Sequence, residues 1–166
     1  QRVHFHPNQC FFTGFDDEIA NAKAGKKALI RMKMNSLSDK QMIEKIYEAA
    51  AAGVKVDLII RGICCLKVGL PGISENVTVH SIVGRFLEHS RIYYFYAGGE
   101  EKLYLSSADL MNRNLSRRVE LLFPILQPNI KAQIVQIYEL MWQDNLKTRV
   151  LQADGSYQKV DRRGLA

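Results

Sequence analysis

The sequence contains little that would specify a secreted, zinc-bound or membrane-spanning protein. Its three cysteines, Cys10, Cys64 and Cys65, show no CxxC or Cys/His spacing typical of a zinc site. An odd number of cysteines with one adjacent pair is a poor disulfide framework, so we expect reduced thiols and a cytoplasmic location, with Cys64 and Cys65 as small buried residues. No apolar run approaches the roughly 20 residues that a membrane-spanning helix needs.

The common nucleotide-binding and hydrolase motifs are also missing. The sequence has no GxxxxGK[ST], no GxGxxG and no GxSxG, which argues against P-loop kinases, Rossmann enzymes and serine hydrolases. The N-terminus, QRVHFHPNQCF, has no Met and no apolar signal core. We therefore expect residues 1–26 to be a leading segment at the cut edge of a preceding domain, and residues 27–166 to form the domain proper.

What is present indicates one globular domain that favours anions. The 166 residues are 47% hydrophobic and 24% charged, which is ordinary for a folded domain with its own core. The formal net charge of +6 favours polyanionic partners such as nucleotides, polyphosphate, nucleic acid or acidic lipid, and does not choose among them.

Hydrophobic periodicity predicts an α/β fold built on a central mixed sheet with helices on its faces. Strands are expected at residues 27–34 and 54–60, with a helix between them that Ser38 and Gln41 begin as a capping box and Gly53 ends. A strand, a helix and a strand of these lengths form a parallel crossover.

The rest of the chain predicts shorter strands and one more helix. The further strands are expected at 77–83, 91–96, 102–105 and 119–123, with a turn at 97–100 and a terminal hairpin around Asp154 and Gly155. A helix at 129–142 should face the core with one apolar stripe, which consists of Ile130, Ile134, Ile137, Tyr138 and Met141.

One short stretch concentrates the chemistry. IVGRFLEHSR, residues 82–91, brings Arg85, Glu88, His89 and Arg91 together between two apolar runs. Arginines can neutralise phosphate oxygens, and an imidazole can move a proton or attack phosphorus. A histidine among solvated surface charges is the alternative. His80, by contrast, falls inside an expected strand, and a structural role suits it better.

Two further segments follow strand ends. Arg61 comes directly after an apolar strand, where ligands gather in open α/β sheets, and Gly62 would allow a ligand to approach the backbone. An arginine that reaches solvent from a strand end is the alternative. After the strand at 102–105, hydroxyl, amide and basic side chains follow, which would suit a phosphate-binding loop or a capped turn: Ser106, Ser107, Asp109, Asn112 and Arg113.

Three segments together resemble the C-terminal portion of the first family of bacterial polyphosphate kinases. They are RGICCL, SENVTVHSIVGRFLEHSRIYYF and YLSSADLMNRNLSRRVELLFP. The resemblance implies a phospholipase-D-like fold and an enzyme that moves the terminal phosphate of ATP reversibly onto polyphosphate with Mg²⁺. It also implies that the magnesium ligands and the histidine that accepts phosphate lie in parts that this chain does not match.

The resemblance gives particular residues a role. Arg61 matches an arginine that contacts nucleotide phosphates, and His89 matches a histidine that binds nucleotide and assists transfer, with Arg91 in the surrounding phosphate shell. The His-x-Lys and Gly-Ser-x-Asn motifs of phospholipase D stand here as His89-Ser90-Arg91 and Ser106-Ser107-Ala108-Asp109, so both are degenerate.

The implied partners are ATP or ADP, polyphosphate, the preceding catalytic domain of the same chain and, at full length, further copies in a homo-oligomer. The implied location is the cytoplasm, with membrane association through a complex as a variant. We expect the isolated chain to turn over little or nothing. Two other functions remain open: a phosphodiesterase or nuclease of the phospholipase D superfamily, and a polyanion-binding module without chemistry.

Overall fold

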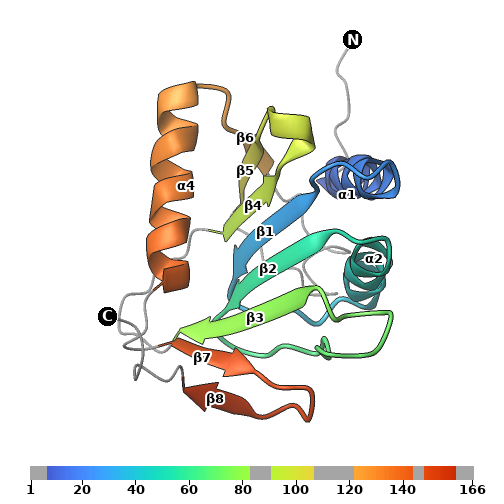
Figure 1. The fold of residues 1–166 in the computed structure, drawn as a ribbon. Coiled ribbons are helices and arrows are strands. Elements are labelled where there is room, and N and C mark those ends of the chain that lie inside the picture. The colour runs from blue at the N-terminus through green and yellow to red at the C-terminus, as the bar shows by residue number, and fades with distance from the viewer. Residues whose placement is uncertain (1–6, 83–90, 107–121, 144–147, 160–166) are drawn as a thin grey trace.

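A mixed eight-stranded sheet forms the centre of the molecule (Figure 1). The computed structural model describes residues 7–82, 91–106, 122–143 and 148–159. The strand order is β6-β5-β4-β1-β2-β3-β7-β8. The strands are β1 (Leu29–Met34), β2 (Lys55–Ile60), β3 (Val77–Ile82), β4 (Arg91–Phe95), β5 (Lys102–Ser106), β6 (Leu122–Pro124), β7 (Thr148–Leu151) and β8 (Tyr157–Lys159).

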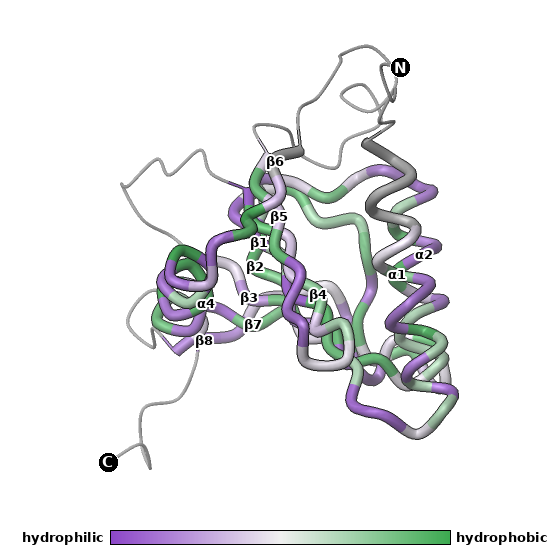
Figure 2. The backbone as a smooth tube through the Cα atoms, turned by 90° about the horizontal axis from the view of Figure 1, so that it is seen from above, coloured by the Kyte–Doolittle hydropathy of each residue, from purple (hydrophilic) through white to green (hydrophobic). Residues whose placement is uncertain are grey.

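Helices cover both faces of this sheet, which confirms the predicted α/β class. The helices are α1 (Pro7–Lys23), α2 (Lys40–Ala51) and α4 (Pro128–Gln143), with a short 3₁₀ turn, η1 (Ala97–Gly99). Seen from above, α1 and α2 lie on one side of the strands and α4 on the other (Figure 2). β1, β2 and β3 are parallel, as the predicted crossover requires, and the outer strands pair antiparallel.

The main core lies between the sheet and the helix pair α1 and α2. Ile30, Met32 and Met34 alternate along β1 toward this core, while Leu29 belongs to a smaller cluster on the α4 side. Successive side chains of a strand point to opposite faces, so β1 contributes to both clusters, and Arg31 and Lys33 on the α4 side are only partly buried.

The start of α2 differs by one residue from the prediction. Asp39, not Ser38, is the N-cap, and its carboxylate accepts a hydrogen bond from the backbone N–H of Met42 at 3.0 Å. An Asp carboxylate is an equally good cap and carries a charge that suits the helix N-terminus. Gly53 follows the helix with φ of 103°, which confirms it as the stop.

Helix α1 was not predicted from the sequence. Phe15 and Ile19 are buried in the main core, and Phe15 meets the ring of Phe95 edge to face. The carboxylate of Glu18 accepts hydrogen bonds from the backbone N–H groups of Leu29 and Ala97, although burial raises the pKa of this carboxyl. Glu18 therefore ties α1 to the start of β1 and to the turn after β4.

The predicted core stripe of the last helix is wrong in part. Tyr138 is buried and Ile134 and Met141 are partly buried, but Ile130 and Ile137 are 39% and 47% exposed. The helix contacts the sheet along a narrow line through Tyr138, and the other two residues lie to one side of this line. α4 therefore presents apolar side chains to solvent as well as to the sheet.

The two cysteines also differ from expectation. Cys65 is exposed and Cys64 is only partly buried, although burial raises the pKa of the Cys64 thiol. Both belong to a segment that runs past the end of β2, where Leu37 and Cys64 form an isolated parallel bridge. The terminal hairpin of β7 and β8 is confirmed, with Gly155 at φ of 87°. Among the described helices, none is long and apolar enough to cross a membrane.

Candidate functional site

One edge of the sheet collects the strand ends that the sequence singled out. The last residues of β1 and β2, Met34 and Ile60, are partners in register, and parallel β3 ends beside them at Ile82. Antiparallel β4 begins at this edge with Arg91, and β5 returns to end here at Ser106. Since ligands bind at the carboxyl ends of parallel strands, this edge is the candidate site.

Arg61 lies at this edge as predicted. It is the first residue after β2, its side chain is exposed, and its backbone N–H donates a hydrogen bond to the carbonyl of Met34 at 3.3 Å. The backbone is therefore held at the tip of β1 while the guanidinium remains available to solvent. A planar guanidinium can donate two hydrogen bonds to the oxygens of one phosphate group.

The role expected for Gly62 is different in the structure. Its backbone N–H donates a hydrogen bond to the carbonyl of Asn35 at 2.6 Å. A Cβ at this position would lie 3.0 Å from the Asn35 oxygen and 3.1 Å from the hydroxyl of Ser36. Glycine thus allows the close approach of the protein's own backbone at Asn35 and Ser36. The Gly62–Asn35 hydrogen bond continues the pairing of β1 and β2 one residue beyond Arg61, and so helps to hold Arg61 in place.

Arg91 and Ser106 are direct cross-strand partners in β4 and β5. Directly opposed residues extend their side chains to the same face of a sheet. Both are buried, with 9% and 7% of their surface exposed. Tyr93, two residues after Arg91, belongs to the main core, so alternation places this pair on the face that carries α1 and α2. Two members of the predicted phosphate shell are therefore brought together, deeper in the molecule than Arg61.

The other predicted site residues lie outside the described residues: His89, Ser107, Asp109, Asn112 and Arg113. The described positions that flank them lie at the candidate edge. Ile82 precedes and Arg91 follows the segment with His89, while Ser106 and its register partner Leu122 flank the other segment. The convergence of Arg61 and His89 stays a prediction.

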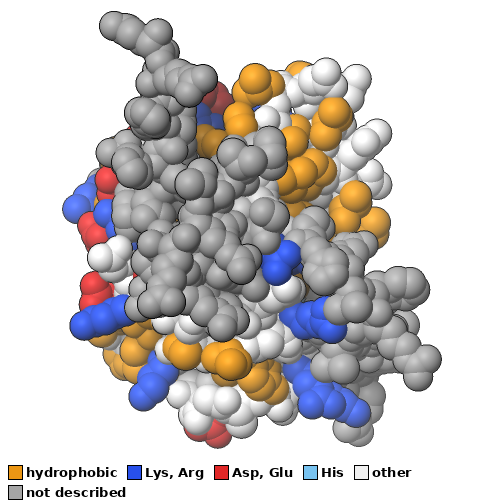
Figure 3. Space-filling model, turned by 180° about the vertical axis from the view of Figure 1, so that it is seen from behind, with side chains coloured by type: hydrophobic (Ala, Val, Ile, Leu, Met, Phe, Trp, Pro, Cys, Tyr) orange, Lys and Arg blue, Asp and Glu red, His pale blue; other side chains and the backbone are white. Residues whose placement is uncertain are grey.

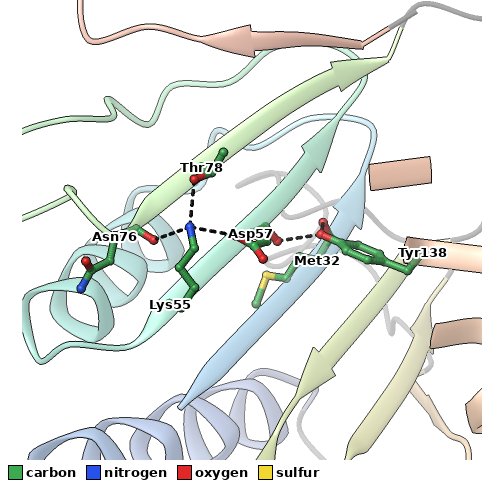
Figure 4. Close-up of polar contacts among 6 residues, drawn as sticks. All are labelled: Met32, Lys55, Asp57, Asn76, Thr78 and Tyr138. Carbon is green, nitrogen blue, oxygen red and sulfur yellow. Dashed lines mark hydrogen bonds and ion pairs between the residues drawn. The ribbon is translucent and has the colours of Figure 1, made fainter. Parts of the chain in front are cut away.

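A polar cluster on the α4 face was missed by the sequence analysis. The ammonium of Lys55 donates hydrogen bonds to the hydroxyl of Thr78 at 2.9 Å and to the carbonyl of Asn76 at 3.4 Å, and pairs with the Asp57 carboxylate at 3.1 Å (Figure 4). The buried Tyr138 hydroxyl donates to the backbone carbonyl of Asp57 at 2.8 Å. The cluster joins β2, β3 and α4. The signal that could have revealed it in the sequence is the pair of charged residues, Lys55 and Asp57, at alternate positions of an otherwise apolar strand.

His80 in β3 packs against the end of α4. Its ring stacks on Trp142 with centroids 3.6 Å apart and planes 11° from parallel. Burial lowers the pKa of His80, an effect that the nearby Asp57 carboxylate opposes. The contact gives His80 a structural role, which suits its position within a strand, and fixes the C-terminal end of α4 near the candidate edge.

The described residues do not fit a magnesium site. In the described ranges, no three His, Cys, Asp or Glu side chains are grouped so that they could hold a metal ion. The predicted site residues that the structure describes at the candidate edge are two arginines and a serine, whereas Mg²⁺ prefers carboxylates and water. No step is therefore assigned to a metal on this chain, and the expectation that its ligands lie elsewhere stays a prediction.

Comparison with known proteins was made for sequence and for structure. The family profile described as polyphosphate kinase C-terminal domain 2 matches residues 4–166. A polyphosphate kinase of Lactiplantibacillus plantarum is 65% identical over 150 residues, which cover 90% of this chain and 21% of that protein.

The solved structures agree. The crystal structure of polyphosphate kinase from Porphyromonas gingivalis matches 97% of this chain with a TM-score of 0.91 at 38% identity, over 25% of that protein. Nuc of Salmonella typhimurium, a phospholipase D family member, matches 80% of this chain and 87% of its own with a TM-score of 0.55 at 15% identity, a similarity of fold. The chain thus spans about a quarter or less of the polyphosphate kinases that it matches and has a phospholipase-D-like fold.

Proposed function

The chain belongs to the polyphosphate kinase C-terminal domain 2 family, and from this premise we propose that it supplies one half of an ATP–polyphosphate phosphotransferase site within a longer protein. The observation that carries the proposal is the position of Arg61, an exposed guanidinium held by backbone hydrogen bonds at the carboxyl edge of the parallel strands. ATP or ADP and polyphosphate are the proposed substrates.

The proposed task of this half is to stabilise negative charge. During phosphoryl transfer the charge spreads over the equatorial oxygens of the transferred group, so fixed cations supply much of the catalysis. Arg61 would bind nucleotide phosphate oxygens from the tip of β2. Arg91, buried beside Ser106, would contribute positive electrostatic potential from inside the domain, where its low exposure to water strengthens its field.

His89 completes the proposed site. A histidine of the preceding domain would attack the terminal phosphorus of ATP, so that a P–N bond forms while the bond from phosphorus to the bridging oxygen breaks and ADP leaves. Polyphosphate would then accept the phosphoryl group, with regeneration of the imidazole. His89 would bind the nucleotide and donate a proton to the leaving oxygen, as an imidazole can.

The proposal extends to assembly and location. The preceding catalytic domain of the same chain is the necessary partner, and a homo-oligomer is proposed for the full-length protein. Two free cysteines in the described part of the chain, one of them exposed, suit the reducing cytoplasm that we propose as its location.

The test uses the full-length protein. We expect Arg61→Ala and His89→Ala each to lower kcat/KM for ATP in polyphosphate synthesis by a factor of about 100 or more, the loss of a charge-assisted contact in the transition state. Arg61→Lys should recover part of the loss, because an ammonium keeps the charge but not the two-pronged geometry.

Lys26→Ala is the matched control. Lys26 is an exposed cation at the opposite edge of the sheet, before β1 begins, and its loss should leave kcat/KM unchanged. Near-normal synthesis by both the Arg61 and the His89 variants would remove the site from this edge.

A further inference from the structure

Helix α4 exposes an apolar surface that the sheet does not use. Ile130, Ile137 and Leu140 are 39%, 47% and 62% exposed, and Leu126, two residues before the helix, is 80% exposed. From behind, hydrophobic side chains gather over the α4 side of the molecule, at the upper right (Figure 3). Single exposed apolar residues are common, but a contiguous row of them marks an interaction site.

No charge interrupts this row. α4 contains two charged residues, and both bind toward the sheet. The ammonium of Lys131 donates hydrogen bonds to the carbonyls of Glu100 and Glu101 at 3.3 and 3.2 Å, and Glu139 pairs with Arg31 at 3.3 Å. In a chain with 24% charged residues, an exposed row that contains no charged residue resembles the core of an interface, where charges are depleted.

The spacing of the exposed apolar residues along α4 indicates what kind of element could pack on them. Ile130, Ile137 and Leu140 follow at intervals of seven and three residues, which fits a seam that packs against another helix, and the intervening position of that seam, Gln133, is polar. The adjoining exposed positions of α4, which include Asn129, Gln136 and Gln143, are polar. The apolar seam thus has a defined border.

We propose that an apolar helix from another part of the same longer polypeptide packs on this seam. From Ile130 to Leu140 the seam rises only about 15 Å, at about 1.5 Å per residue. A seam of that length offers a small contact, whereas stable association of separate proteins needs roughly 1,200 Å² or more, which disfavours a second copy as the sole occupant. A tethered partner needs less area, because the linker supplies a high effective concentration.

The length of the relatives supports a tethered partner. This chain covers 25% of the solved polyphosphate kinase and 21% of the curated one, so most of such a polypeptide lies outside it. The inference goes beyond the proposed function. An apolar seam binds no phosphate, and the docking would stand even if Arg61 proved dispensable for catalysis.

The experiment places a photoreactive benzophenone amino acid at Leu140 of the full-length protein, with the same group at Ala132, an exposed position of α4 away from the seam, as the matched control. Leu140 is exposed in the domain, so the larger side chain does not disturb its core. After irradiation, mass spectrometry identifies the crosslinked peptides. We expect crosslinks from position 140 to a peptide of the same polypeptide outside these 166 residues, with a yield several-fold above that from position 132.

Three results would overturn the inference. Crosslinks that join two copies of α4 would assign the seam to a homo-oligomer. Crosslinks confined to these 166 residues of the same molecule would make the seam internal to the domain. Equal yields at positions 140 and 132 would show that no partner packs on the seam. An Arg61→Ala background that leaves the crosslink intact keeps this outcome separate from the proposed catalytic site.

Discussion

At the scale of the residue, exposure separates the two described arginines of the candidate site. Arg61 is exposed at the tip of β2 and can meet a ligand directly, whereas Arg91 is buried next to Ser106. A buried guanidinium reaches fewer oxygens but acts through a lower dielectric. We therefore expect Arg61 to govern nucleotide contact and Arg91 to govern the position and potential of the edge.

A single histidine provides a pH test of the fold. Burial lowers the pKa of His80 below its ordinary value of 6.5, so the folded state resists protonation while the unfolded state accepts it. This contribution to the free energy of unfolding is fully present above about pH 6.5, and it is lost as the pH falls through the pKa of His80 in the folded state. Thermal melting of the 166-residue chain between about pH 7 and pH 5 should therefore lose more stability in the wild type than in His80→Phe, which keeps a ring against Trp142.

Tryptophan fluorescence can follow the same effect of pH on the contact between His80 and Trp142. Trp142 is the only tryptophan, so its emission reports on the stack with His80. Parallel curves of stability against pH for the wild type and His80→Phe would show that burial against Trp142 does not lower the pKa of His80, which would contradict this account.

At the scale of the element, local patterns predicted the sheet well and the helix surfaces less well. The partial alternation in residues 29–34 identifies β1, whose Arg31 and Lys33 are only partly buried, and the mainly apolar run at 55–60 identifies β2, which is buried from Val56 to Ile60. Helix α1 was missed because its burial depends on long-range contacts of Phe15 and Glu18. The exposed half of α4 was misassigned because periodicity shows an apolar stripe but not what covers it.

The candidate site was predictable to a similar degree. Arg61 was found from its place after a buried strand, and the pairing of Arg91 with Ser106 follows from strand order, which the sequence only partly indicates. The Lys55–Asp57 cluster was missed because its partners, Thr78 and Tyr138, are distant in the sequence. The two charged residues alone do not show which groups they contact.

The N-cap of α2 offers a test at this scale. Removal of the buried Asp39 carboxylate leaves the N–H of Met42 without its acceptor, so Asp39→Ala should lower the free energy of unfolding of the 166-residue chain by about 1 kcal/mol in urea titration. Ser38→Ala is the control and should change it by less than about 0.5 kcal/mol. A larger loss of stability from Ser38→Ala than from Asp39→Ala would identify Ser38 as the N-cap.

At the scale of the whole molecule, the chain is a domain of a polyphosphate kinase family with one edge that carries an arginine and one helix that presents an apolar seam. These two surfaces explain why a domain with its own core would still be incomplete as a catalyst. Phosphoryl transfer requires a nucleophile, and the proposed nucleophile belongs to a preceding domain.

The isolated chain should therefore lack activity. Given ATP and magnesium, the 166 residues alone should form no polyphosphate above background, and they should not hydrolyse a phosphodiester such as bis(p-nitrophenyl) phosphate. Polyphosphate synthesis would show that the domain holds its own nucleophile. Phosphodiester hydrolysis would favour the alternative of a phospholipase-D-type phosphodiesterase.

The most direct measurement is the crystal structure of the full-length protein with a non-hydrolysable ATP analogue. The account predicts phosphate oxygens within about 3 Å of the Arg61 guanidinium, the distance of a charge-assisted hydrogen bond, with the imidazole of His89 facing the same phosphates. A nucleotide bound away from the carboxyl ends of β1 and β2, with Arg61 still in solvent, would contradict it.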